Sequence, residues 1–141
     1  MRVCGVTLQR AAKHDLRWLS RWGLVYYGCC EQLNGKIEIL RWIPNLRKIS
    51  ASPWSNAERI IEKVNGDYVL SRKPNPAVLA GDAWRPEWAR EELVRFLGQT
   101  GGNCHVEFIM KDISTVRYEP QRLWEWATIA MEVVEEFARK N

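Results

Sequence analysis

Short apolar runs that end in polar residues recur along the chain, and each one leads into a stretch with helical periodicity. The clearest run reads LVYYGCCE and ends in two cysteines and a carboxylate. It is apolar throughout instead of alternating, which is typical of a strand covered on both faces in a parallel sheet. The pattern predicts four strands of this kind: Leu24–Glu31, Leu46–Ser52, Asp67–Lys73 and Cys104–Asp112.

The stretches around these strands predict helices. Residues 8–22 repeat leucine and alanine at helical spacing, and Gly23 follows as a stop. Pro86 and Pro120 fit the first turns of two later helices. Residues 72–83 contain two prolines and predict a long extended loop. The helices expected after residue 24 cover residues 34–43, about 55–64, 85–97 and 119–139.

Strands separated by helices indicate an α/β fold with a parallel sheet and right-handed crossovers. We expect a single domain over residues 1–141, in which one N-terminal helix precedes four β-loop-α units. A TIM-type (β/α)8 barrel contains eight such units, so the chain predicts half of that barrel. A doubly wound open sheet competes with it, but no G-x-G-x-x-G follows the first strand. The units cover about residues 24–43, 46–64, 67–98 and 104–139.

Composition narrows the class of protein. The chain is 27% charged and 46% hydrophobic, with a net charge of +4, as in ordinary soluble domains. Its basic residues are scattered instead of gathered with aromatics, which argues against nucleic acid as a partner. No apolar run is long enough to cross a membrane, and the first residues lack the apolar core of a signal peptide. We therefore expect a cytoplasmic protein whose four cysteines are reduced thiols.

Eight tryptophans are many for a chain of this length. All but Trp54 lie on or beside predicted helices, where packing against a sheet would use them as large core residues. Trp54 falls in a strand-to-helix loop. The tryptophans expected in the core are Trp18, Trp22, Trp42, Trp84, Trp88, Trp124 and Trp126.

Barrel chemistry takes place where the strands end at their carboxyl side. That rule selects polar residues after all four predicted strands. His105, which begins its strand, and His14, on a helix, fall outside the selection. The selected residues are Cys29, Cys30, Glu31, Ser52, Trp54, Lys73, Asn75, Lys111 and Asp112.

A metal site is one interpretation of the first strand end. Side chains alternate along a strand, so Cys29 and Glu31 share a face and Cys30 takes the other. A thiolate and a carboxylate could bind zinc with Asp112 as a further ligand, which makes Cys29, Cys30 and Glu31 the predicted metal residues. The alternative is that one cysteine is a small buried hydrophobic residue.

Anion binding is the second interpretation. Lys73 and Lys111 each end a strand and could bind a carboxylate or phosphate group as point charges. Lys111 and Asp112 could equally form an ion pair of small energetic effect. Asp82, in the long loop, is a further candidate acid, although such carboxylates commonly cap or solvate. Glu107 lies among apolar neighbours, so we expect it to need a partner.

Four segments carry a resemblance to a known family: GLVYYGCCE, KIEILRWIPNLRKISASPW, DYVLSRKPNPAVLAGDAW and CHVEFIMKDISTVRYEPQRLWEW. Together they resemble the later strands of the uroporphyrinogen decarboxylase-like superfamily of (β/α)8 barrels. The resemblance runs from about residue 8 onward and implies the C-terminal half of such a barrel.

The superfamily contains decarboxylases and cobalamin-dependent methyltransferases, so the resemblance implies an enzyme that acts on a small anionic molecule or a corrinoid-bound methyl group. Its zinc methyltransferases carry His-x-Cys where this chain has Gly28-Cys29-Cys30, and a last cysteine where it has Lys111-Asp112. Their zinc chemistry therefore does not carry over.

From these observations we expect a catalytic set and a substrate-binding set. A non-catalytic binding or assembly subunit, or an inactive fragment of a longer enzyme, is the alternative. Half a barrel has open strand edges, which favour association. We therefore expect a homodimer or a missing N-terminal half as partner. The expected catalytic residues are Cys30, Glu31, Lys111 and Asp112, and the expected substrate-binding residues are Trp54, Lys73 and Asn75.

Overall fold

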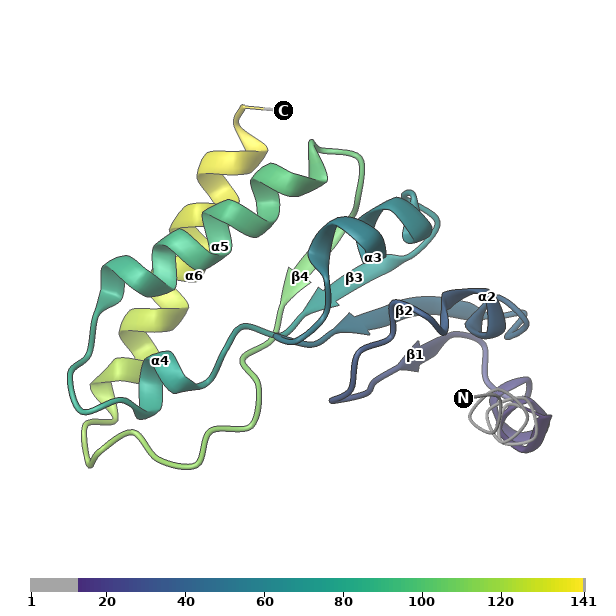
Figure 1. Ribbon diagram of the computed structural model, residues 1–141, viewed down its shortest axis with the longest axis horizontal. Coiled ribbons are helices and arrows are strands. Elements are labelled where there is room, and N and C mark those ends of the chain that lie inside the picture. Colours follow the sequence, from purple (N-terminus) through teal and green to yellow (C-terminus); the bar gives the residue numbers. More distant parts are fainter. Residues whose placement is uncertain (1–12, 141) are drawn as a thin grey trace.

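The computed structural model describes residues 13–140, which form an α/β structure around one four-stranded sheet (Figure 1). All three strand pairs are parallel, and the strands lie side by side in chain order. The predicted α/β class and parallel sheet are confirmed. The strands are β1 (Val25–Tyr27), β2 (Leu46–Ala51), β3 (Val69–Arg72) and β4 (Val106–Phe108).

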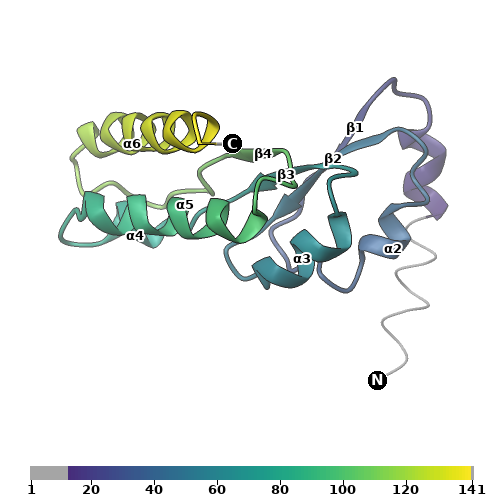
Figure 2. The ribbon, with the colours of Figure 1, turned by 90° about the horizontal axis from the view of Figure 1, so that it is seen from above.

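Helices α2, α3 and α5 lie on one side of the sheet, and α6 runs alongside α5 (Figure 2). Residues 13–19 form a further helix beside α2, where Asn45 donates hydrogen bonds to the carbonyl groups of Leu19 and Trp22. Among the described residues, none of the helices is long and apolar enough to cross a membrane. The labelled helices are α2 (Ile37–Leu40), α3 (Ala57–Val64), α4 (Ala77–Ala80), α5 (Pro86–Thr100) and α6 (Gln121–Ala138).

The main core fills the space between the sheet and these helices. Alternate strand residues point towards the helices, as the pleat of a strand requires. A smaller cluster joins α5 to α6 through Leu93, Leu97, Ala130 and Val133. The main core includes Val25, Ile49, Ala51 and Leu70 from the strands and Ile37, Leu40, Ile60, Val64 and Phe96 from the helices.

Local chemistry sets the bounds of α3. The Asn56 side chain accepts a hydrogen bond from the Arg59 N–H and caps the helix start. Asn65 ends the helix in the left-handed conformation, and Gly66 follows with a φ of +79°. A Cβ on Gly66 would lie 2.9 Å from the Asn103 carbonyl oxygen, so both the backbone conformation and the close approach require glycine.

Several predicted bounds differ from the structure. The first strand ends at Tyr27 instead of Glu31, and the helix predicted at 34–43 keeps regular α-helical structure only in α2. The predicted loop 72–83 contains α4, which its two prolines concealed because a proline also fits the position before a helix. Residues 8–12 of the first predicted helix, and Cys4, lie outside the described residues.

The prediction that the helical tryptophans fill the core is wrong for most of them. The space between sheet and helices is filled mainly by leucine, isoleucine and valine, so most of the indole rings remain in contact with solvent. Trp84 and Trp126 are half-buried. Five tryptophans have exposed fractions between 49% and 68%: Trp18, Trp22, Trp42, Trp88 and Trp124.

Candidate functional site

A charged cluster lies where the strands end at their carboxyl side. The Lys111 ammonium group lies 3.0 Å from the Asp112 carboxylate, so the predicted ion pair is present. This hydrogen bond raises the pKa of Lys111, with a smaller contribution from the nearby Cys30, and lowers the pKa of Asp112. The charge of Lys73 lowers the pKa of Asp112 further. Lys111 and Asp112 are therefore in direct contact, and Lys73 and Cys30, which follow two other strands, lie close enough to influence their pKa values.

The cluster contains more positive than negative charge. Lys73 and Lys111 carry ammonium groups, and Asp112, which pairs with Lys111, is the carboxylate of the cluster. The Asp112 side chain is 78% exposed and the Cys30 side chain also faces solvent, so a ligand can reach both. The arrangement suits a small molecule with one negative group, because one lysine charge is left uncompensated.

Glu31 and Cys29 do not join this cluster. Since β1 ends at Tyr27, the alternation that placed these two side chains on one face does not continue to them. Glu31 forms an ion pair with Lys36 at 2.9 Å, and this bond raises the pKa of the lysine. The Cys29 sulfur accepts a hydrogen bond from the Glu31 N–H at 3.3 Å. Both groups serve the turn after β1.

A metal site is not assembled in the described part of the chain. Within residues 13–140, no group of three or more His, Cys, Asp or Glu side chains is placed to hold a metal ion. Cys29, Cys30 and Glu31 therefore do not fit zinc as they stand, and zinc binding stays a prediction.

The two other predicted substrate-binding residues have different positions. Trp54 is 57% exposed in the loop between β2 and α3. Asn75 instead holds local structure: its N–H donates to the Glu92 carboxylate, and its side-chain oxygen accepts from the Ala77 N–H at 3.0 Å. Asn75 thus caps α4.

The sheet face opposite the helices is polar. Lys48 lies 2.8 and 2.9 Å from the two oxygens of Glu107, which supplies the partner expected for that carboxylate. The Lys48 ammonium group also lies 5.1 Å from the centre of the Tyr26 ring, and the Tyr26 hydroxyl donates to Ser71. Residues that alternate with the core positions thus form a connected network across four strands. Ser50, buried on β2, holds the turn after β1 through hydrogen bonds with the Cys29 backbone.

Arg72, at the end of β3, is a site residue that sequence reasoning missed. It faces the helices, is 8% exposed, and donates to the Ser52 carbonyl at 2.8 Å and to Glu92 at 3.2 Å. Burial lowers its pKa, and the Glu92 carboxylate opposes that effect. A charged residue at the end of a short strand, directly before Lys73, was the available signal.

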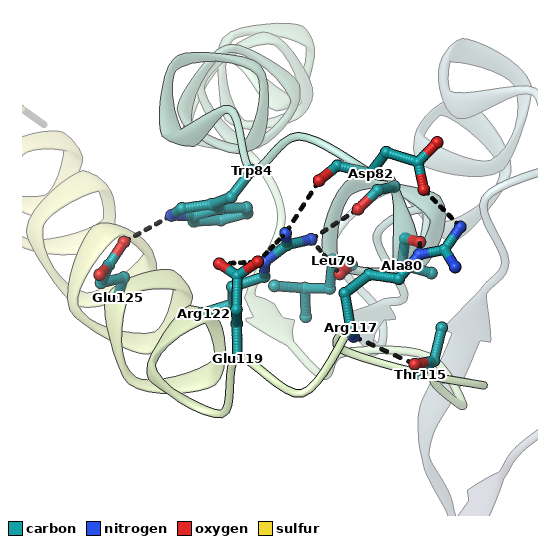
Figure 3. Close-up of polar contacts among 10 residues, drawn as sticks. Leu79, Ala80, Asp82, Trp84, Thr115, Arg117, Glu119, Arg122 and Glu125 are labelled. Carbon is teal, nitrogen blue, oxygen red and sulfur yellow. Dashed lines mark hydrogen bonds and ion pairs between the residues drawn. The ribbon is translucent and has the colours of Figure 1, made fainter.

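Arg122 is the second missed residue, and it holds the loop that borders this end of the sheet (Figure 3). Its side chain is 1% exposed although it lies in the first turn of α6. The guanidinium donates to the carbonyl oxygens of Leu79, Gly81 and Asp82 and to the Glu119 carboxylate.

Nearby, Arg117 forms a 2.6 Å ion pair with the Asp82 side chain and donates to the Ala80 carbonyl (Figure 3). Asp82 is therefore engaged in fixing the loop, as a structural carboxylate would be. These contacts tie the loop after β4 to the loop after β3, so both carboxyl-end loops are held in one place.

Comparisons with known proteins add no relative. No protein-family model matches the sequence, and no curated protein or solved structure shows significant similarity to it.

Proposed function

We propose that this chain is half of an α/β barrel of the uroporphyrinogen decarboxylase-like kind, and that its carboxyl-end cluster binds a small anionic substrate. The strand order supports the barrel. A doubly wound sheet reverses its strand order at a switch point, whereas barrel strands follow one another in chain order, as β1 to β4 do. Helices on one face and a polar network on the other also suit a barrel wall.

The single observation that carries the substrate class is the cluster of Lys73, Lys111, Cys30 and Asp112. Two ammonium groups and one carboxylate leave a net positive charge at the end of the sheet. A carboxylate substrate would take the place of solvent between the two lysines, and each charge-assisted hydrogen bond would orient it. The polar face would form the floor of the site through Lys48 and Tyr26.

Decarboxylation is the reaction we propose for this site. Loss of carbon dioxide leaves an electron pair on the substrate carbon, which must then take a proton. The Lys111 ammonium group, whose side chain is 15% exposed, and the solvent-facing Cys30 thiol are the proton donors of the cluster. Methyl transfer from a corrinoid is the second candidate, favoured by the exposed Cys30 thiol, since a thiolate is a strong nucleophile. In the non-catalytic alternative, the same cluster binds its ligand without turnover.

The apolar surface of α6 supports a partner that completes the barrel. One side of the helix packs on α5 and β4, a second apolar stripe remains exposed, and β4 is the last strand of the described sheet. Apolar stripes next to a free strand edge favour association. The stripe consists of Leu123, Trp124, Met131 and Val134, with exposed fractions of 39% to 65%.

The position of the first helix favours a complementary half over a second copy. Residues 13–19 already cover the β1 end of the sheet on its helix side (Figure 2). In a dimer of identical halves, β4 of the partner would pair with β1. The α6 helix of the partner, which follows its β4, would then need the space that residues 13–19 occupy. A partner chain that ends at its last strand, with no helix after it, avoids this conflict. We therefore propose a complementary half that begins and ends with a strand.

Isothermal titration calorimetry with acetate and succinate at low salt tests the anionic site. We expect saturable binding that weakens about tenfold in Lys111→Met or Lys73→Met, the effect of one lost charge-assisted hydrogen bond. Lys63→Met, a charge removal on α3, is the matched control and should leave binding unchanged. Equal weakening in the control, or no saturable binding in the native chain, would refute the proposal. Release of carbon dioxide from bound carboxylates separates an enzyme from a binding subunit.

Light scattering after size-exclusion chromatography tests the partner. A monomer that forms a stable one-to-one complex with a complementary βαβαβαβ chain would support the proposed closure. A tight homodimer that Met131→Glu dissociates would instead establish self-association through α6.

A further inference from the structure

A polar cleft of about 320 Å³ lies on the helix side of the sheet. It is separate from the cluster of Lys73, Lys111, Cys30 and Asp112, called the Lys111 cluster below. It is bounded by the start of α3, the end of β3 and the side of α5. Its polar lining includes two guanidinium groups, Arg72 and Arg95, together with Gln99 and the Glu92 carboxylate. The proposed substrate site uses none of these side chains.

Arg72, which lines this cleft, has one N–H donor without an acceptor among the described residues. Its Nη atoms donate to Ser52 and Glu92, and its guanidinium lies 5.0 Å from the centre of the Phe96 ring. The Nε atom is buried and has no hydrogen-bond partner among the described residues. A buried N–H without an acceptor typically costs about 1–3 kcal/mol, so this guanidinium is not fully compensated by its protein neighbours.

The charges in the cleft do not balance. Glu92 is the carboxylate of the lining, and it accepts hydrogen bonds from both Arg72 and the Asn75 N–H. Arg95 forms no ion pair or hydrogen bond within residues 13–140, and its side chain is exposed. The cleft therefore has one uncompensated positive charge that a ligand can reach.

The start of α3 adds donors of the kind that bind phosphate. Asn56 caps the Arg59 N–H, which leaves the two earlier N–H groups of the first turn, at Ala57 and Glu58, without a partner in the described chain. Ala57 lines the cleft. Free N–H groups at a helix start favour anions, and guanidinium forks match the oxygen spacing of phosphate.

We propose that this cleft binds a phosphate group, as inorganic phosphate or as part of a phosphate monoester. Arg95 and the start of α3 contact the phosphate oxygens, while Arg72 supplies charge from the wall and Gln99 donates from α5. The ligand sits between α3 and α5 and links the two helices. The site depends on neither the reaction nor the closure proposed above.

Calorimetric titration with inorganic phosphate at low ionic strength tests the site, with sodium chloride added to keep the ionic strength constant. We expect saturable binding to the native chain and about tenfold weaker binding to Arg95→Gln, the effect of one lost charged hydrogen bond. Arg47→Gln is the matched control, because Arg47 is exposed on β2 and does not line the cleft. Its phosphate affinity should equal that of the native chain.

Further measurements separate this site from the Lys111 cluster. On phosphate addition, the amide NMR signals of Ala57 and Glu58 should shift, and Lys111→Met should leave phosphate affinity unchanged. The proposal is overturned if phosphate does not saturate, if Arg95→Gln binds as tightly as the native chain, or if Lys111→Met abolishes binding. Acetate that competes as strongly as phosphate would overturn the assignment to phosphate. A phosphate monoester that binds more tightly than inorganic phosphate would extend the ligand class.

Discussion

Replacing Arg122 by methionine should strongly destabilise the fold, because it removes the group that holds the loop after β3. The guanidinium is 1% exposed and donates to three backbone carbonyls, at 2.6 Å to Gly81, 3.1 Å to Leu79 and 3.2 Å to Asp82. It also lies 2.8 Å from a Glu119 oxygen. Methionine fills a similar volume but leaves the three carbonyls without a donor (Figure 3).

Two effects set the magnitude. Each hydrogen bond from a charged donor contributes about 1.5–3 kcal/mol, but burying the guanidinium offsets part of that sum. Glu119 is 45% exposed, so its ion pair adds little. Losing one partner of a buried charged network typically costs about 3–5 kcal/mol, and we expect Arg122→Met to fall in that range. This is a large part of the roughly 5–15 kcal/mol that stabilises a domain.

Urea unfolding followed by circular dichroism measures the effect. With a urea dependence of about 2 kcal/mol per molar, the unfolding midpoint should fall by roughly 2 M. Arg139→Met is the matched control on the same helix, because Arg139 is 75% exposed and its ion pair with Glu135 spans 3.4 Å. That control should change stability by less than about 0.5 kcal/mol. If both variants unfold at the same urea concentration, the reasoning about Arg122 is refuted.

Three further predictions concern the sheet and its carboxyl end. Lys48→Met should lower the free energy of unfolding by about 1 kcal/mol in urea, because it leaves the one-third-exposed Glu107 carboxylate unpaired. The double variant Lys48→Met/Glu107→Gln should recover most of that loss. Among the described cysteines, Cys30 should react first with iodoacetamide, because Cys29 and Cys104 are half-buried. Mass spectrometry measures the order of labelling, and faster labelling of Cys104 would contradict its burial in the structure. The pKa of Asp112 is lowered by Lys111, so its carboxyl NMR titration midpoint should lie below that of an ordinary aspartate and should rise in Lys111→Met. The stability from this pair should be lost only as the pH falls through that lowered midpoint.

The sequence predicted the class of fold well, because that information is local. Apolar runs and helical spacing identified four strands and most of the helices between them, although α4 was predicted as a loop, and parallel pairing followed from their alternation. The strand ends were less predictable, since the apolar run LVYYGCC continues beyond the three residues that pair with β2. The turn after β1 is held by the contact of Lys36 with Glu31, which periodicity does not report.

The sequence predicted only the residues of the site that lie at the carboxyl ends of the strands. Residues at the carboxyl ends of parallel strands must be neighbours, and Lys73, Lys111 and Asp112 are. The pairs that complete the site join residues distant in sequence, such as Lys48 with Glu107 and Arg122 with the Leu79 carbonyl. A charged residue type indicates that a side chain needs a partner, but the sequence does not show which distant residue that partner is.

Two surfaces of the described chain, the open sheet face and the outer side of α6, differ in kind, and the difference indicates where association would begin. On the open sheet face, Lys48, Tyr26 and Glu107 satisfy one another, so that face is stable in water without a cover. On α6, exposed apolar side chains such as Trp124 and Met131 have no comparable compensation, and burying each would contribute about 1.5–3 kcal/mol. A partner would therefore gain most of its binding free energy at α6 and the β4 edge, while the polar face remains free to line a substrate site.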